Sequence, residues 1–383
     1  MAEQHGKTLV PQIRFAGFTD PWEQRKLGEL YKEVSEKNDL TYGRDRIISV
    51  AHMYFNPVVY VTEDDYLKTY NVMRLGDIAF EGNRSKNFAH GRLVENTIGD
   101  GIVSHVFKVF RPIQPFDLMY WKYSINNEKA MKDVLTRSTK ASTMMHELVA
   151  KDFLNEEIAV PSLEEQRRIG AFFDRLDSLI TLHQRKYDKL CVLKKSMLDK
   201  MFPKGGSLYP EIRFAGFTDP WEQRKLGELA DNIDTGRSVF CSESYGRYPV
   251  LGSTSVIGSD SSYDYEGAFL LTARVGANAG NLYRFAGKVK ISDNTVFLQA
   301  PNSDFLFYLL SHFDLRKLSF GTGQPLVRAS ELRAVEIDVP KSENEQKSIA
   351  EFFDRLDSLI TLHQRKLELL RNIKKSMLDK MFV

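Results

Sequence analysis

The sequence predicts an α+β protein in which two globular domains of mixed α/β structure alternate with two long helices. Three observations predict this class. The chain holds two internal repeats, the second repeat has the spacing of a coiled coil, and short strand-like runs alternate with turns between the repeats. With 383 residues, 42% of them hydrophobic and 27% charged, the chain has a globular composition and enough length for more than one domain.

The first repeat, IRFAGFTDPWEQRKLGEL, stands at Ile13–Leu30 and again at Ile212–Leu229. The second, FFDRLDSLITLHQRK, stands at Phe172–Lys186 and Phe352–Lys366 and is followed both times by KKSMLDKMF. The segments between the repeats are unrelated. One frame built around two different inserts indicates one task performed on two targets. A recent duplication with drifting interiors is the alternative, although drift should also have blurred the frames.

The repeats divide the chain into four expected parts. These are a domain over 1–161 with the leading segment 13–30, a helix over 162–205, a domain over 206–340 with the leading segment 212–229, and a helix over 341–383. Strand-like runs within the domains are Pro57–Val61, Val103–Phe110, Ala268–Thr272 and Thr295–Leu298.

The second repeat is predicted to be helical because its apolar residues follow alternating steps of three and four, which is the seam of a coiled coil. A helix over Leu163–Met201 would be about 58 Å long. Neither helix can bury its stripe alone, so the two should pack on each other. The pattern leaves their direction open, and we expect an antiparallel pair with an approximate two-fold axis. The seams are Phe173, Leu176, Ile180, His183, Tyr187, Leu190, Met197 and Met201, broken at Lys194, and Phe353, Leu356, Ile360, His363, Leu367, Leu370, Met377 and Met381, broken at Lys374.

Each insert contains a basic window without Asp or Glu, at Gly82–Val94 and at Gly267–Ser292. Arg and Lys bind phosphates, Arg and Asn read base edges, and Gly permits close backbone approach, so the windows predict DNA contacts. A solvated hairpin is the alternative for either window alone. The candidate DNA-binding residues are Asn83, Arg84, Lys86, Asn87, Arg92, Arg274, Asn278, Asn281, Arg284, Lys288, Lys290 and Gln324.

One stretch of small and polar residues precedes the last strand of each insert. The first is Ser138–Val149 and the second is Gly321–Leu332. Each is expected to turn into a short helix whose N-terminus could hold a phosphate. As an isolated signal this pattern is weak, because such loops are common connectors.

The motifs of catalysis and metal binding are missing. The sequence has no Asp/Asn-Pro-Pro-aromatic methylase box, no Gly-x-Gly-x-x-Gly fingerprint and no complete phosphate loop. Cys191 and Cys241 are too few for a metal site or a disulfide framework, which suits the cytoplasm. No apolar run is long enough to span a membrane. We therefore predict a cytoplasmic binding protein with no catalytic residues, metal or cofactor of its own.

The arrangement of the frame resembles the specificity subunit of Type I restriction–modification enzymes. It contains a Trp-x-x-x-x-Leu-Gly-Glu-Leu start (Trp22–Leu30 and Trp221–Leu229), a variable domain, a Val-Pro and a long helix with Phe-Phe, all twice over. The resemblance implies two target-recognition domains that each read half of a split double-stranded DNA site and are held apart by an antiparallel helical pair. It also implies two separate modification subunits that methylate adenine with S-adenosylmethionine. It assigns ATP-driven translocation and cleavage, with ATP and Mg, to restriction subunits, and leaves open whether two of these join the complex.

The sequence leaves two other functions open. A two-headed scaffold for proteins or small ligands explains the helices equally well but leaves the basic windows to chance. A self-contained DNA methylase or nuclease conflicts with the missing motifs.

Overall fold

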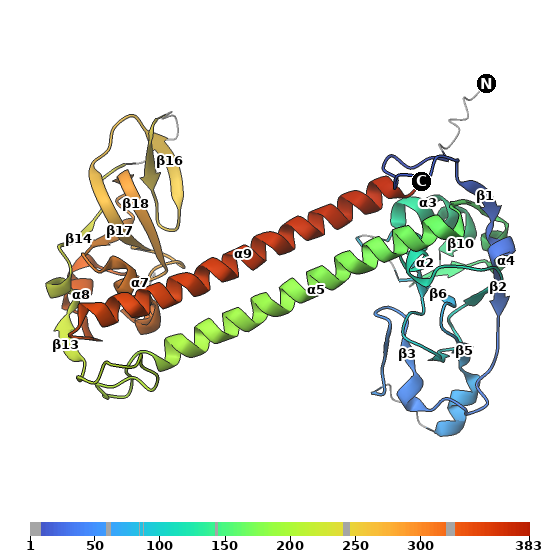
Figure 1. Cartoon of the computed structure of the whole chain (residues 1–383), viewed down its shortest axis with the longest axis horizontal. Coiled ribbons are helices and arrows are strands. Elements are labelled where there is room, and N and C mark those ends of the chain that lie inside the picture. Colours follow the sequence, from blue (N-terminus) through green and yellow to red (C-terminus); the bar gives the residue numbers. More distant parts are fainter. Residues whose placement is uncertain are drawn as a thin grey trace. The chain divides into compact units, whose positions relative to one another are not determined.

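The chain forms two compact units. The computed structural model describes residues 9–58, 63–83, 85–86, 88–141, 145–239, 246–318 and 326–383. The first unit consists of Met1–Gln184 and Arg365–Val383, and the second of Arg185–Gln364. Each unit holds one insert and part of both long helices, α5 (Leu163–Lys200) and α9 (Glu343–Met381), which are light green and red in Figure 1.

The first unit is built on a four-stranded antiparallel sheet in the order β2-β9-β6-β7. Its strands are β2 (Tyr31–Val34), β6 (Ile78–Glu81), β7 (Arg92–Glu95) and β9 (Val109–Pro112). Two-stranded sheets pair β1 (Glu23–Lys26) with β12 (Glu157–Val160), β3 (Ile48–Ser49) with β4 (Tyr54–Phe55), β5 (Asn71–Met73) with β8 (Gly101–Val103), and β10 (Thr139–Ala141) with β11 (His146–Leu148). The helices are α1 (Leu27–Leu30), α2 (Leu118–Ser124), α3 (Glu128–Ser138) and α4 (Ala150–Asn155), with 3-10 turns at Arg44–Arg46 and Asp64–Thr69.

The second unit has a six-stranded sheet in the order β14-β19-β17-β18-β15-β16. Its strands are β14 (Asn232–Thr235), β15 (Tyr248–Leu251), β16 (Val256–Asp260), β17 (Tyr265–Ala273), β18 (Leu282–Ile291) and β19 (Thr295–Gln299), and β13 (Glu222–Lys225) pairs separately with β20 (Glu336–Val339). The helices are α6 (Leu226–Leu229), α7 (Ser303–Phe313) and α8 (Ala329–Ala334), with a 3-10 turn at Leu315–Leu318. Four neighbouring strands of this sheet, β14-β19-β17-β18, have the same topology as β2-β9-β6-β7 in the first unit. In both sets the strand that comes first in the chain lies beside the one that comes last, followed by the second and the third. The unrelated inserts therefore share a sheet core.

The long helices and their predicted antiparallel direction are confirmed. In the first unit Lys374 Nζ lies 2.5 Å from Oδ1 of Asp177, and Arg371 Nη2 donates to Oε1 of Gln184 at 2.9 Å. A later position in α5 thus lies beside an earlier position in α9, which is the register of an antiparallel pair. The predicted seam residues lie on the less exposed face, and Leu367 is only 4% exposed.

The repeated segments that end the long helices belong to the cores of the units in which they lie. Phe202, which follows α5, is buried in the second unit beside Trp221. Phe382, which follows α9, is buried in the first unit beside Trp22. Packing thus explains the KKSMLDKMF repeat, because its last residue is a phenylalanine that is buried in the core of one unit or the other.

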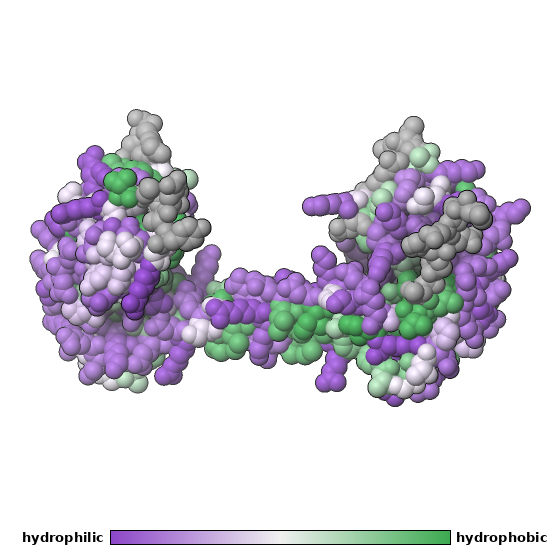
Figure 2. Space-filling model, turned by 90° about the horizontal axis from the view of Figure 1, so that it is seen from above, coloured by the Kyte–Doolittle hydropathy of each residue, from purple (hydrophilic) through white to green (hydrophobic). Residues whose placement is uncertain are grey.

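Apolar side chains remain at the surface of both long helices, where Figure 2 shows hydrophobic residues among the polar ones. Leu179 and Leu182 of α5 are exposed, and so are the matching residues of α9, Leu359 and Leu362. Because these four leucines come from the repeat, each helix carries the same apolar surface.

Two of the four predicted strands are confirmed and one is wrong. Ala268–Thr272 lies within β17 and Thr295–Leu298 within β19. The run Val103–Phe110 is divided by a turn between β8 and β9, in which Phe107 N–H donates to the carbonyl of Ser104. Pro57–Val61 lies partly outside the described residues, and its first two residues form a turn.

Candidate nucleic-acid interface

The first basic window contains the hairpin that joins β6 to β7. Asn83 is exposed and donates from Nδ2 to Oε1 of Glu81 at 3.3 Å, and Lys86 is also exposed. The predicted contacts Arg84 and Asn87 lie outside the described residues. Asn83 and Lys86 are therefore accessible to a ligand in solution.

Arg92 closes this hairpin. Its Nε donates to Oε2 of Glu81 at 2.6 Å, and its Nη2 donates to the backbone oxygen of Ala51 at 2.5 Å. The guanidinium also lies 5.2 Å from the centre of the Phe88 ring. This packing favours a structural role for Arg92, since a DNA phosphate would have to compete with a partly buried ion pair.

The loop between β17 and β18 presents three of the predicted contacts. Arg274, Asn278 and Asn281 are exposed, and Asn281 Nδ2 donates to Oδ1 of Asn278 at 3.3 Å. The loop is braced at its start, because Arg274 N–H donates to the carbonyl of Asn294 and the Arg274 carbonyl accepts from Val327 N–H. The guanidinium of Arg274 is thus presented by a fixed backbone.

Arg284, in the same window, is turned toward the helices. Its Nη1 lies 2.9 Å from Oδ1 of Asp354 in α9 and 3.1 Å from Oδ1 of Asp304 in α7. Its guanidinium carbon is 4.4 Å from the centre of the Phe307 ring and 5.3 Å from that of Tyr308. This set of contacts favours a structural role for Arg284.

The two lysines of β18 are also paired with acids of neighbouring strands. Lys288 lies 3.7 Å from Glu266 of β17, and Lys290 lies 3.3 Å from Asp260 of β16. The acid-free window is therefore partly neutralised by residues that the sequence places elsewhere. The last candidate, Gln324, lies outside the described residues.

Both predicted polar stretches lead into a short helix as expected, α4 at Ala150 and α8 at Ala329, and the first also forms a hairpin that was not expected. Ser138–Val149 ends α3 and then forms the hairpin of β10 and β11, and residues 142–144 lie outside the described residues. Residues 321–325 of the stretch Gly321–Leu332 also lie outside them, and the remainder leads into α8 at Ala329. Thr139–Ala141 forms a strand because it pairs in register with His146–Leu148, a contact that its polar composition did not indicate.

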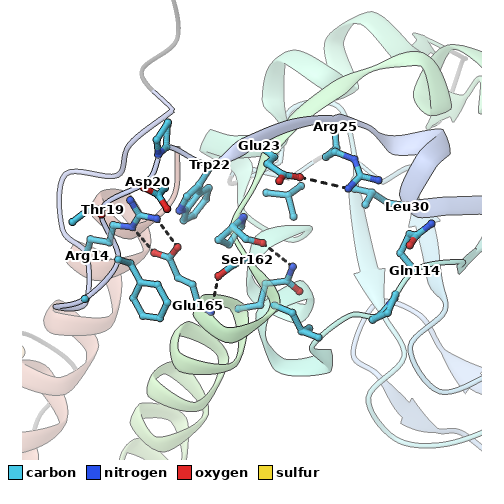
Figure 3. Close-up of a pocket in the computed structure, with 18 residues that line it drawn as sticks. Arg14, Thr19, Asp20, Trp22, Glu23, Arg25, Leu30, Gln114, Ser162 and Glu165 are labelled. Atoms are coloured by element: carbon cyan, nitrogen blue, oxygen red, sulfur yellow. Dashed lines mark hydrogen bonds and ion pairs between the residues drawn. The ribbon is translucent and has the colours of Figure 1, made fainter.

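The repeated frame of the first unit encloses a cavity of about 370 Å³ between the leading segment and the start of α5 (Figure 3). Arg14 makes a two-pronged ion pair with Glu165, from Nε at 2.7 Å and from Nη2 at 2.8 Å, and this hydrogen bonding raises the pKa of Arg14. Gln166 Nε2 donates to the carbonyl of Pro161 at 3.0 Å. Trp22 lines the cavity beside them. The leading segment is thus held on the helix by a buried charge pair.

The second unit repeats this construction. Arg213 pairs with Glu345 at 2.7 and 2.8 Å, and Gln346 Nε2 donates to the carbonyl of Pro340 at 2.9 Å. Trp221 Nε1 donates to Oε1 of Glu345 at 3.3 Å. The ion pair and the glutamine contact therefore form in both units, whereas Nε1 of the matching Trp22 has no hydrogen-bond partner among the described residues. The role of these pairs was missed, although their presence in both copies of the frame was a signal.

The lysines that interrupt the two seams also have equivalent roles. Lys374 lies 2.5 Å from Asp177, whose other oxygen accepts from the hydroxyl of Tyr123 at 2.7 Å. In the second unit Lys194 lies 2.6 Å from Asp357, and the hydroxyl oxygen of Tyr308 lies 2.9 Å from the same carboxylate and 2.7 Å from Oδ1 of Asp354. Each break in the apolar pattern is thus an ion pair between the helices, reinforced by a tyrosine of the adjacent domain.

The part of the chain that the structure describes contains no group of three or more His, Cys, Asp and Glu residues that could hold a metal ion. No described helix combines the length and apolar character needed to cross a membrane.

Comparison with known proteins links this arrangement to one family. The family described as Type I restriction modification DNA specificity domain matches residues 19–191 and 218–372. The Type I restriction enzyme MjaVIII specificity subunit of Methanocaldococcus jannaschii is 26% identical over 413 residues, which cover 94% of this chain and 92% of that protein. The putative Type I restriction enzyme MjaX specificity subunit of the same organism is 22% identical, covering 98% and 95%.

A solved structure agrees with the fold. The S subunit of a Type I restriction–modification system from M. genitalium superposes with a TM-score of 0.63 at 14% identity, covering 98% of this chain and 99% of that one. At this identity the likeness supports the architecture alone.

Proposed function

This chain belongs to the family of Type I restriction–modification DNA specificity domains, and we propose that it directs a modification complex to a bipartite, asymmetric DNA site. The domain over 1–161 reads one half of the site and the domain over 206–340 reads the other. The helical parts over 162–205 and 341–383 hold the two at a set separation. The complex acts on DNA in the cytoplasm.

The observation that carries this proposal is that one frame is built twice around unlike inserts. The ion pairs Arg14–Glu165 and Arg213–Glu345 have the same geometry, whereas the sheets have four and six strands. The exposed hairpin and loop residues differ as well: Asn83 and Lys86 in one unit, and Arg274 with two asparagines in the other. Different side chains present different hydrogen-bonding groups to base edges, so two unlike half-sites are expected.

The repeated surfaces support docking of two identical partner subunits. A pair of equal surfaces related by an approximate two-fold axis binds two copies of one protein. Leu179 with Leu182 and Leu359 with Leu362 supply matching exposed apolar positions on the two long helices. We assign these surfaces to two adenine methyltransferase subunits. This chain is non-catalytic in the proposal: S-adenosylmethionine belongs to the methyltransferases, and ATP and Mg belong to a restriction subunit where one is present.

Replacing the first insert by a second copy of the other insert tests this division of labour. The variant carries the residues of 230–340 in place of 31–161 and keeps both frames. Together with its methyltransferase subunit it should methylate a symmetric site made of two copies of one half-site. Mapping methylated adenines in DNA from cells that express the pair measures this. A variant that kept the original site would contradict the assignment of one half-site to each insert.

The salt dependence of DNA binding distinguishes the proposed function from the alternative, a two-headed protein scaffold. Phosphate neutralisation releases counterions, so DNA affinity should fall steeply as salt rises from 50 to 200 mM. The chain assembled with its methyltransferase subunits is titrated with duplex DNA at each salt concentration. The absence of any salt-dependent binding would favour the scaffold.

A further inference from the structure

An open cavity with an apolar rim lies beside the hairpin that carries the candidate contacts of the first unit. The cavity measures about 290 Å³, and three separate segments line it: the end of β6 with Asn83, the turn before β9 with Val106, and the start of β11 with Met145. Val106 is 65% exposed and Met145 is 46% exposed. Two large apolar side chains thus meet an exposed amide at the surface, and exposed apolar residues that gather in this way favour contact with a partner.

The second unit has a corresponding place at Arg274. Gly82 is the first residue after β6, and Arg274 is the first after β17, the matching strand of the shared sheet core. The carbonyl of Gly82 accepts a hydrogen bond from His146 N–H at 2.9 Å, and the carbonyl of Arg274 accepts one from Val327 N–H at 2.8 Å. In both units, therefore, a segment from later in the insert is fixed against the start of the loop that carries the candidate contacts.

The side chains at this place differ between the units. Arg274 is exposed, whereas a side chain at Gly82 would collide with the carbonyl oxygen of His146. Continuing the strand registers into the turns places the exposed Asn294 opposite Arg274 and the exposed Val106 opposite Gly82. The first unit thus presents apolar surface where the second presents an arginine and an asparagine.

The charged groups that line the cavity do not favour a phosphate. The carboxylate of Glu81 accepts from Nε of Arg92 at 2.6 Å, and Nζ of Lys108 lies 3.9 Å from Oε1 of Glu33. Glu147 is exposed and would repel a phosphate group. A neutral base edge that carries a methyl group therefore suits this rim better than the DNA backbone does.

We propose that Val106 and Met145 contact the 5-methyl group of a thymine in the half-site that the first unit reads. This inference rests on the proposed function. In the major groove the methyl group marks the thymine of an A·T pair, and apolar side chains are its usual contacts. The unbranched side chain of Met145 can adapt to the position of the methyl group.

Asn83 supplies the polar half of the same recognition. One N–H of its Nδ2 donates to Oε1 of Glu81 at 3.3 Å, which orients the amide. The amide keeps a second N–H and its oxygen, and this pair of groups matches N7 and N6 of adenine. We therefore expect Asn83 to read the adenine of the same or the next base pair.

The test compares thymine with deoxyuridine, which lacks only the 5-methyl group. The chain is assembled with its methyltransferase subunits, and a randomised-site library gives the sequence that the complex selects. The half-site of the first unit is the half that changes when the insert 31–161 is replaced. Each thymine of this half-site is then changed in turn to deoxyuridine, and DNA binding is measured by fluorescence anisotropy. We expect one position at which loss of the methyl group weakens binding about three- to tenfold.

A double variant, Val106→Ser with Met145→Gln, separates this contact from an effect of the methyl group on DNA shape. In the double variant, thymine and deoxyuridine at that position should bind within about twofold of each other. Both residues are exposed, so the variant should fold, and thermal unfolding checks this. Val192→Ser, at a residue of α5 that is 69% exposed, is the matched control and should keep the natural preference for thymine.

Three results would overturn the inference: a first half-site without thymine, equal binding of thymine and deoxyuridine at every position of it, or a double variant that keeps the natural preference. A complex that selects no bipartite sequence would refute the proposed function as well. A complex that selects such a sequence without a methyl preference in the first half-site would refute this inference alone.

Discussion

Truncation of Phe202 to alanine should destabilise the second unit by about 3–5 kcal/mol, the range for loss of a buried aromatic side chain. Only 1% of Phe202 is exposed. Its ring centroid lies 6.0 Å from that of Trp221, 6.0 Å from that of Phe353 and 5.3 Å from that of His312. These large rings cannot collapse into the space left behind, which places the expected loss in the upper half of the range.

The matching change in the first unit is Phe382→Ala. Phe382 is 4% exposed, and its ring centroid lies 5.8 Å from that of Tyr120 and 5.9 Å from that of Phe173. The same residue type at the same place in the repeat should therefore produce a loss of similar size. The difference is the unit affected, since Phe382 belongs to the first and Phe202 to the second.

Urea unfolding of the full chain, followed by tryptophan fluorescence, distinguishes the units. Trp22 and Trp121 lie in the first unit and Trp221 in the second. A background with Trp22→Phe and Trp121→Phe reports on the second unit, and a background with Trp221→Phe reports on the first. With an m-value of about 2 kcal/mol/M, the expected loss moves the affected midpoint by about 2 M toward lower urea.

The result that refutes this reasoning is specific. Phe202→Ala would have to lower the free energy of unfolding reported by Trp221 by less than about 1 kcal/mol, or to shift the unfolding midpoint of the first unit instead of the second. Leu193→Ala, at an exposed position of α5, is the matched control and should cost less than about 0.5 kcal/mol.

Four further predictions address charge, recognition and spacing. Glu345→Gln should cost about 3–5 kcal/mol in urea unfolding, because it leaves the guanidinium of Arg213 without its buried partner. Glu95→Gln should gain stability relative to the natural chain as pH rises from 6 to 8.5. Burial raises the folded-state pKa of Glu95 to about 10, which exceeds the ordinary value of 4.5, so between these pH values only the unfolded chain has lost the proton. The free energy of unfolding of the natural protein should therefore fall by up to about 1.4 kcal/mol per pH unit. Equal slopes in the two proteins would contradict this. Arg274→Ala should weaken or relax one half-site only, by about 1–3 kcal/mol, and unaltered binding across a randomised-site library would remove it from the candidates. Insertion of one heptad into α5 should lengthen or abolish the tolerated spacer between half-sites, and an unchanged spacer with unchanged affinity would refute the spacing role of the helices.

The helices were predictable because their signal is local and repeated. Steps of three and four place the seam on one face, and the structure confirms helices over Leu163–Lys200 and Glu343–Met381. The same pattern could not explain Lys194 and Lys374, which read as breaks in the seam. Their partners are Asp357 and Asp177, which only the antiparallel register brings within reach.

The strands were harder to predict, because hydrogen-bond pairing with distant segments decides which residues form a strand. Val103–Phe110 has strand composition throughout but turns in its middle, where Phe107 bonds back to Ser104. Thr139–Ala141 has the composition of a connector but pairs with a second short strand. In both places hydrogen bonds to other residues outweigh local propensity.

The sequence alone determined that one frame occurs twice around unlike inserts, because identity of residues needs no coordinates to be recognised. It also located the basic windows. Only the tertiary structure decided which charges in them are available: Arg284 is taken by acids of α7 and α9, and Lys288 and Lys290 are paired with acids of neighbouring strands, whereas Arg274 is exposed. The physical reason is that Coulomb attraction and hydrogen bonding act over a few ångströms in space, and residues distant in the chain become neighbours only when the sheet and helices pack.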